Sequence, residues 1–217
     1  VYVDKTEMVY QLAKESHPYF LSRPRRFGKS LLISTLDAYF SGRKDLFTGL
    51  AIENLETEWI EYPVLKISFG SGNFVESKGL NAKLEYVVSQ FEEDFGINKN
   101  SEDYSVRLAN IIKSIYEKTG KQVVILIDEY DKPILDALYT PAEEENRTIL
   151  RAFYSPLKDF DHYIKFIFIT GITKVSHVNI FSGLNQLDDI SLNKRYSSIC
   201  GISQTELEKY FEPEIIA

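Results

Sequence analysis

The chain has 217 residues, of which 44% are hydrophobic and 26% charged, and its formal net charge is −7. These values are typical of a globular protein with a core of ordinary size, and they exclude a disordered chain. The negative charge disfavours a surface that coats nucleic acid, and no apolar run reaches the length of a membrane-spanning helix.

Four short apolar runs, which favour β-strands, alternate with stretches of helical periodicity. We expect strands over 19–21, 63–69, 123–127 and 164–170, and helices over 29–40, 81–95, 105–117, 142–157 and 203–211, after a helix-bearing lead-in over 1–18. Continuous β-branched runs are typical of strands that are buried on both faces of a parallel sheet. The alternation therefore predicts an α/β fold.

The ends of the chain bear on its domain organisation. We expect one domain over 1–202 and the start of a following helical segment over 203–217, where Ser203 and Glu206 have the spacing of a capping box. The chain begins without methionine and stops within this expected helix, which favours a fragment of a longer protein over a short protein with processed ends. The single cysteine, Cys200, excludes an intrachain disulfide and favours a reducing compartment such as the cytoplasm.

Between the first expected strand and the first expected helix, residues 23–30 read RPRRFGKS. They fit the phosphate-binding pattern G-x-x-x-x-G-K-[ST], except that Arg23 replaces the first glycine. In this pattern, backbone N–H groups surround the phosphates, the lysine reaches the outer phosphates and the hydroxyl binds Mg²⁺. The alternative is a chance Gly-Lys-Ser at the start of a helix. The residues expected to contact a nucleotide are Arg25, Arg26, Phe27, Gly28, Lys29, Ser30 and Leu31.

Two further strand ends carry polar residues. Asp128 and Glu129 follow a buried strand, where an aspartate can hold Mg²⁺ and the adjacent glutamate can deprotonate an attacking water. The alternative is a solvated pair that caps the next helix. Thr170 ends the fourth strand, where its hydroxyl can bind the γ-phosphate or the water, or simply belong to an ordinary turn.

The arginines allow two interpretations each. Arg25 and Arg26 can contact phosphates, or they can pair with Asp131 or other surface acids. Arg195 can stabilise charge on the nucleotide, within the chain or across an interface, or it can form a surface ion pair. Because Pro24 favours extended backbone at Arg23, that guanidinium can turn toward the phosphates or outward to an acid.

The blocks SRPRRFGKSLL, ILIDEYDKPI, ITGITKVS and NIFSGLNQLDDISLNKRYSSICGIS resemble the bacterial AAA-ATPase-like family. The loop is also similar to the GPRRxGKT loop of archaeal and STAND-type ATPases. The resemblance implies a three-layer α/β/α P-loop NTPase fold whose mostly parallel sheet has the strand order 5-1-4-3-2. It assigns the Walker A roles to Lys29 and Ser30, the Walker B roles to Asp128 and Glu129, and the sensor position to Thr170.

Three functions follow from the motifs and the resemblance. The first is an ATPase in which Ser30 and Asp128 hold Mg²⁺, and which regulates a PD-(D/E)XK nuclease-like domain that the family carries after this module. The second is a nucleotide-dependent switch or scaffold with little hydrolysis, which the replaced first glycine favours. The third is a nucleic-acid interaction module, which the basic cluster 23–29 favours and the net charge disfavours. The absence of an NKxD motif favours ATP over GTP, and the oligomeric state is left open.

Overall fold

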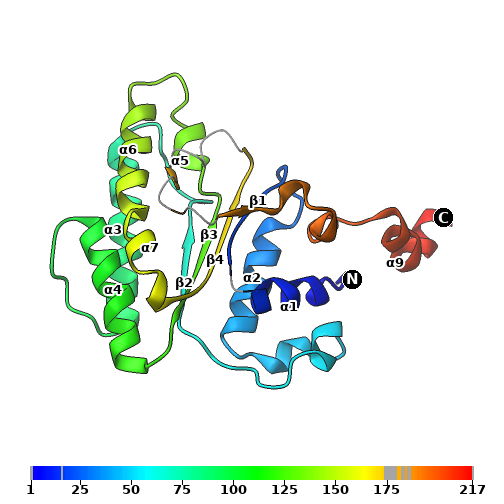
Figure 1. Ribbon diagram of the computed structural model, residues 1–217. Coiled ribbons are helices and arrows are strands. Elements are labelled where there is room, and N and C mark those ends of the chain that lie inside the picture. The colour runs from blue at the N-terminus through cyan, green and yellow to red at the C-terminus, as the bar shows by residue number, and fades with distance from the viewer. Residues whose placement is uncertain (1, 16, 174–179, 182–183, 185–186, 217) are drawn as a thin grey trace.

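A sheet of five parallel strands runs through the centre of the computed structural model, which describes residues 2–15, 17–173, 180–181, 184 and 187–216 (Figure 1). Its strands are β1 (Pro18–Ser22), β2 (Val64–Ser68), β3 (Val123–Asp128), β4 (Ile164–Gly171) and β5 (Asp188–Asp189). The spatial order is β2-β3-β4-β1-β5, and every neighbouring pair is parallel. The predicted P-loop NTPase fold and strand order, counted from the opposite edge, are therefore confirmed.

Both faces of the sheet are covered, as the apolar runs predicted. All six residues of β3 are buried. Their side chains alternate between two hydrophobic clusters, so that Ile125 and Ile127 belong to one cluster and Val124 and Leu126 to the other. A strand buried in this way has no position for a polar side chain until it reaches Asp128 at its end.

One face of the sheet packs against α3 (Ser77–Asp94), α4 (Tyr104–Thr119), α6 (Ala142–Tyr154) and α7 (Pro156–Asp159), while the short α5 (Lys132–Leu135) follows β3 (Figure 1). The single helix expected over 142–157 is divided between α6 and α7. Pro156 has no N–H to donate to the carbonyl of residue 152, so helical hydrogen bonding is interrupted there. The 3₁₀ turn η3 (Asp161–Tyr163) leads into β4.

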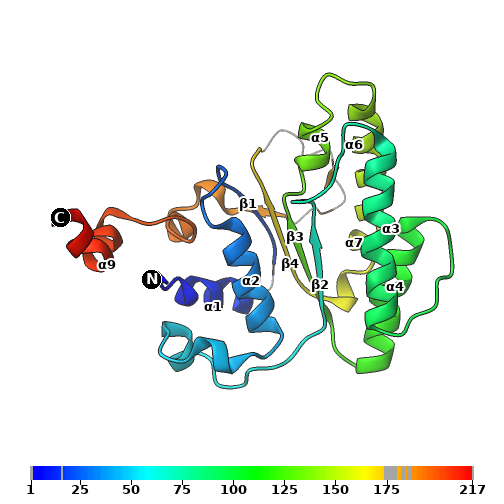
Figure 2. The same cartoon turned by 180° about the vertical axis from the view of Figure 1, so that it is seen from behind.

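The opposite face packs against α1 (Thr6–Glu15) and α2 (Lys29–Phe40), together with the 3₁₀ turns η1 (Lys44–Phe47) and η2 (Ala51–Asn54) (Figure 2). The turns η4 (Ile190–Leu192) and η5 (Lys194–Tyr196) follow β5, and they contribute Ile190 and Tyr196 to the same cluster. This layer brings the first residues of the chain next to residues that follow the sheet.

The last helix, α9 (Gln204–Ile216), lies beyond the sheet at the end of an extended segment (Figure 2). The capping box is confirmed, because Ser203 N donates to Glu206 Oε2 (2.8 Å) and Glu206 N donates to Ser203 Oγ (3.3 Å). Lys5 forms an ion pair with Glu206 and so links α9 to the lead-in. No helix in the described part of the chain is both long and apolar enough to cross a bilayer.

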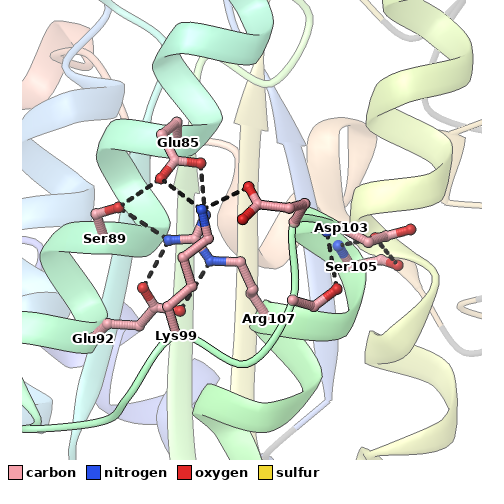
Figure 3. Close-up of polar contacts among 9 residues, drawn as sticks. Glu85, Ser89, Glu92, Lys99, Asp103, Ser105 and Arg107 are labelled. Atoms are coloured by element: carbon pink, nitrogen blue, oxygen red, sulfur yellow. Dashed lines mark hydrogen bonds and ion pairs between the residues drawn. The ribbon is translucent and has the colours of Figure 1, made fainter.

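A buried arginine joins α3 and α4, two of the helices that cover the first face of the sheet (Figure 3). Arg107 of α4 is fully buried, and its Nε and Nη2 donate to the two carboxylate oxygens of Glu92 of α3 at 2.9 and 2.7 Å. Nη1 donates to Glu85 (2.6 Å) and Nη2 also donates to Ser89 (2.9 Å). Every donating nitrogen of the guanidinium thus has an acceptor, as burial of this charge requires.

Candidate functional site

Three strand ends that carry the predicted motifs meet at the carboxyl edge of the sheet (Figure 1). The loop 23–28 follows β1, Asp128 ends β3, and Thr170 lies near the end of β4, which pairs with both of the other strands. Ligands of open parallel α/β sheets bind at this edge. The topology therefore brings together motifs that are up to about 150 residues apart in the sequence.

The loop before α2 has the backbone shape of an anion-binding turn. Arg26 and Gly28 both have positive φ, at 67° and 87°, and α2 begins at Lys29. A Cβ at Gly28 would meet no atom within 4 Å, so the glycine is needed for its φ and not for space. The N-cap residue Gly28 has no side chain that could cap the first turn of α2, so the N–H groups of this turn can donate to an anion.

Lys29 points back into this loop. Its side chain is buried, and Nζ donates to the carbonyl oxygens of Arg23 (2.9 Å) and Pro24 (3.0 Å). An ammonium group has three donors, and these carbonyls occupy two of them. The lysine is therefore held inside the loop by neutral acceptors, which an anionic phosphate can replace with stronger, charge-assisted hydrogen bonds.

Hydrogen bonds connect the start of α2 with the ends of β3 and β4. The Ser30 hydroxyl donates to Asp128 Oδ2 at 2.7 Å, and the Thr170 hydroxyl donates to Asp128 Oδ1 at 2.5 Å. Asp128 and Thr170 are both buried. Asp128 is thus oriented from both sides, and the alternative interpretation, a solvated pair that caps the following helix, is wrong for this residue.

The oxygens of Ser30 and Asp128 fit a magnesium site. Mg²⁺ prefers oxygen ligands, and it commonly takes one or two from the protein and the others from phosphates and water. Neighbouring ligands of an octahedral Mg²⁺ lie about 3 Å apart, and these two oxygens lie 2.7 Å apart. A small separation of the two side chains would admit the ion, with the Ser30 proton turned away.

Glu129 adopts the left-handed backbone conformation, with φ of 55°. Its N–H donates to Thr170 Oγ1 (3.4 Å), and its carbonyl accepts from Lys132 N (3.0 Å). The carboxylate lies near the end of β2, because a Cβ built on Gly70 would be 3.6 Å from Glu129 Oε2. Positive φ costs free energy at a non-glycine residue, so the surrounding contacts must hold this turn in place.

Arg23, the residue in place of the first glycine, turns away from the loop interior. Its Nη1 donates to the carbonyl oxygens of Ser191 (2.7 Å) and Ser22 (3.0 Å), and Nη2 donates to that of Tyr196 (3.4 Å). The guanidinium therefore binds carbonyl groups of η4 and η5, which is neither of the two orientations expected from the sequence.

The remaining loop residues border a cavity of about 250 Å³ beside the start of α2. Arg26, Phe27, Gly28 and Leu31 line it, whereas Arg25 is exposed at the tip of the loop. The alternative partner of the arginines, Asp131, is wrong: it is fully buried, and its carboxylate accepts from Ile172 and Thr173.

The far wall of the cavity comes from residues to which the sequence analysis assigned no contact with a nucleotide. They belong to the lead-in and to the segment before α9, and they include Tyr2, Val3, Lys5, Cys200, Gly201 and Ile202. Burial raises the pKa of the Cys200 thiol to about 11. Residues 199–202 belong to the last block that resembles the family, but nothing in the sequence predicted that this block lies next to the loop.

Arg195 lies apart from the strand ends. Its Nη1 donates to Glu15 Oε1 (2.5 Å) and its Nε donates to Gln11 Oε1 (3.1 Å), both on α1. The surface ion pair expected as the alternative is thus present, and a role toward the nucleotide stays a prediction. In the blocks after Thr170, residues 174–179, 182–183 and 185–186, among them Lys174, lie outside the described residues.

The chain is similar to a described protein family and to a known protein. The model of the family described as "Predicted AAA-ATPase" matches residues 1–181. A protein from Azotobacter chroococcum mcd 1, described as an uncharacterized protein in the vnfD 5′ region, is 43% identical over 216 residues. That alignment covers 99% of this chain but only 42% of the relative, so the chain spans less than half of the relative's length.

Proposed function

Since the chain belongs to the predicted AAA-ATPase family, we propose that it binds ATP with Mg²⁺ at the carboxyl edge of the sheet and hydrolyses it. The observation that carries this proposal is the hydrogen-bonded chain Ser30–Asp128–Thr170. It connects the phosphate loop, the acidic strand end and the sensor position through direct contacts, beside the buried Lys29.

Each residue has a distinct role in the proposed reaction. Lys29 exchanges its two carbonyl partners for oxygens of the outer phosphates, and the N–H groups at the start of α2 donate to the same phosphates. Ser30 and Asp128 are the residues that would hold Mg²⁺, which when bound neutralises charge on the outer phosphates. Glu129 orients the attacking water and takes its proton, while the Thr170 hydroxyl exchanges Asp128 for the γ-phosphate or positions the water.

The cavity beside Phe27 and Leu31 is the proposed binding site for the base and sugar of ATP. It lies directly against the first turn of α2, and aromatic and aliphatic side chains make up much of its wall. Such linings suit a flat heterocycle, whose polar edge then needs only a few partners. Phosphates in the loop and a base in this cavity would occupy adjoining parts of one site.

Two substitutions in the purified protein test the hydrolytic proposal. We expect Glu129→Gln to retain ATP binding and to lower turnover about 100-fold or more, because it removes the general base. Lys29→Ala should weaken ATP binding and lower turnover, because it removes the charge that faces the phosphates. Lys44→Ala and Glu117→Gln, both exposed and remote from the loop, are the matched controls. Isothermal calorimetry measures binding and phosphate release measures turnover.

The same measurements separate the rival functions. ATP binding without turnover in the wild type would support a nucleotide-dependent switch, and unchanged turnover in both variants would exclude this site as the hydrolytic one. We also propose that ATP binding and hydrolysis regulate a C-terminal nuclease-like domain of the full-length protein. The orientation of Arg23 removes one argument for the switch, because its guanidinium does not enter the space that the first glycine would leave open.

A further inference from the structure

A buried carboxylate that none of the proposed catalytic roles uses lies directly behind the site. Asp131 is fully buried and follows Glu129 by two residues, in the turn that joins β3 to α5. Carboxylates are rarely buried to this extent unless their hydrogen bonds define something that the fold requires. The partners of this carboxylate therefore indicate its role.

The position of Asp131 predicts a helix cap that is absent. It is the residue before α5, where aspartate commonly accepts hydrogen bonds from the first N–H groups of a helix. Its side chain caps no such group. The carboxylate points instead to the end of β4, where Oδ2 accepts from Ile172 N (2.9 Å), Thr173 N (2.7 Å) and Thr173 Oγ1 (3.0 Å). The Asp131 carboxylate therefore does not cap α5, and instead accepts three hydrogen bonds from the two residues that follow β4.

The packing around this contact leaves little freedom. A Cβ at Gly171 would lie 3.0 Å from Asp131 Oδ1 and 2.4 Å from Tyr130 Cε1, so only glycine lets the turn approach the strand end so closely. Asp131 Oδ1 is buried and has no hydrogen-bond partner among the residues that the structure describes. Tyr130 reinforces the contact, because its N–H donates to Thr170 O (3.0 Å) and its hydroxyl donates to Thr173 O (3.0 Å).

This contact holds the two groups that the proposed reaction must align. Glu129 lies two residues before Asp131, and Thr170 lies two residues before Ile172, the first partner of its carboxylate. We infer that Asp131 is a positioning residue for hydrolysis: by binding the N–H groups of Ile172 and Thr173, it fixes the exit of β4 against the turn after β3. It thereby holds Glu129, in its strained conformation, and Thr170 in the geometry that the γ-phosphate and the water require. This inference rests on the proposed function.

The test compares Asp131→Ala with Asp131→Asn and with Asp136→Asn. The asparagine variant keeps a carbonyl oxygen that can accept the same hydrogen bonds. Asp136 directly follows α5 and pairs with Lys132, so its variant changes charge near the turn without removing any of the three hydrogen bonds from Ile172 and Thr173 to Asp131. The readouts are residue-resolved amide exchange at Ile172 and Thr173, ATP affinity by calorimetry, and steady-state turnover.

We expect Asp131→Ala to lose exchange protection at Ile172 and Thr173, to bind ATP with wild-type affinity and to lower turnover about 10- to 100-fold. Asp131→Asn should recover most of the protection and turnover, and Asp136→Asn should behave as the wild type. Three results would overturn the inference but not the proposed function. They are equal turnover in Asp131→Ala and wild type, unchanged amide exchange at Ile172 and Thr173, and an asparagine variant that is as slow as the alanine variant. A wild type that does not hydrolyse ATP would overturn the proposed function and the inference with it, while the exchange result would still test the contact.

Discussion

Arg23 donates from Nη1 to the carbonyl oxygen of Ser191 at 2.7 Å, and Ser22 N donates to Ser191 Oγ at 2.9 Å. The entrance of the phosphate loop is thus joined to η4 by a side chain and a main-chain group. A glycine at position 23 could not make the first of these contacts. Arginine at this position therefore has a structural role at the loop entrance that is compatible with phosphate binding on the other side of the loop.

Replacing Arg23 should affect stability more than catalysis. Arg23→Ala removes hydrogen bonds to three carbonyl groups, so we expect the free energy of unfolding to fall by about 1–3 kcal/mol. Arg23→Gly should lose somewhat more, because glycine also gives the unfolded chain additional freedom. Neither variant should raise ATP turnover. Urea unfolding and phosphate release measure the two effects, with Arg43→Ala, an exposed arginine paired with Asp45, as the control. Faster hydrolysis in Arg23→Gly would show that the arginine obstructs the phosphates.

The thiol of Cys200 should report on the cavity. Burial raises its pKa to about 11, and only the thiolate reacts with iodoacetamide. At pH 8 we therefore expect alkylation about a hundredfold slower than for an exposed cysteine. The rate should rise as the pH increases toward 11, and ATP should slow it further because the base would cover the cavity. Mass spectrometry measures the modification.

The alkylation experiment needs two comparisons. The protein unfolded in guanidinium chloride gives the rate of the accessible thiol, and Glu129→Gln, which should still bind ATP, shows that protection requires binding and not turnover. If ATP protects Lys29→Ala as well as the wild type, the protection does not come from the phosphate loop. If ATP binds without slowing alkylation, the base does not lie in this cavity.

Local patterns predicted much of the fold correctly. The helix expected over 29–40 has these bounds in the structure, because Gly28 permits the turn before it and Leu32, Ile33 and Leu36 form one buried stripe. The buried character of β3 followed from its unbroken apolar run. By contrast, β5 consists of two aspartates and has no hydrophobic signal, since its pairing with β1 is set by the topology and not by its side chains.

The site was predictable only in part for a similar reason. Lys29, Ser30, Asp128 and Thr170 were recognisable because each lies at or near the end of an element with a clear pattern. The wall formed by the lead-in and residues 199–202 arises from contacts between the two ends of the chain, for which no local pattern exists. The sequence indicated Asp131 only as a possible partner of Arg25 and Arg26, because its hydrogen bonds with Ile172 and Thr173 are tertiary contacts that no local pattern predicts.

The buried network at Arg107 should be sensitive to the loss of one partner and tolerant of the loss of both. Arg107→Met leaves the buried carboxylate of Glu92 without its cation, so we expect the free energy of unfolding to fall by about 3–5 kcal/mol. Arg107→Met combined with Glu92→Met should recover most of this loss, because it removes the unpaired buried charge. Urea unfolding measures each variant. Lys113→Met, which breaks an exposed pair with Glu117, should change stability by less than about 1 kcal/mol.

A double variant as unstable as Arg107→Met would contradict this expectation. It would show that the packing of the guanidinium between α3 and α4, and not the balance of charge, makes the larger contribution. Circular dichroism of each variant before unfolding establishes that the helices are present.

The same network predicts how stability depends on pH. The hydrogen bond from Arg107 lowers the pKa of Glu85 from its ordinary value of 4.5. A carboxyl group whose folded pKa is lowered binds protons more readily when the chain is unfolded, so its contribution is complete above pH 4.5 and is lost as the pH falls through the folded pKa. We therefore expect the free energy of unfolding to decrease as the pH drops below about 4.5.

Glu85→Gln should be less stable at pH 6 and should show a shallower decrease between pH 5 and pH 3, measured by urea unfolding at each pH. Glu117→Gln, which removes an exposed carboxylate outside this network, should keep the wild-type slope. If Glu85→Gln also keeps that slope, Glu85 does not couple folding to proton binding, and the acid sensitivity arises from other carboxylates such as Asp103, whose pKa is lowered by hydrogen bonds from Ser105.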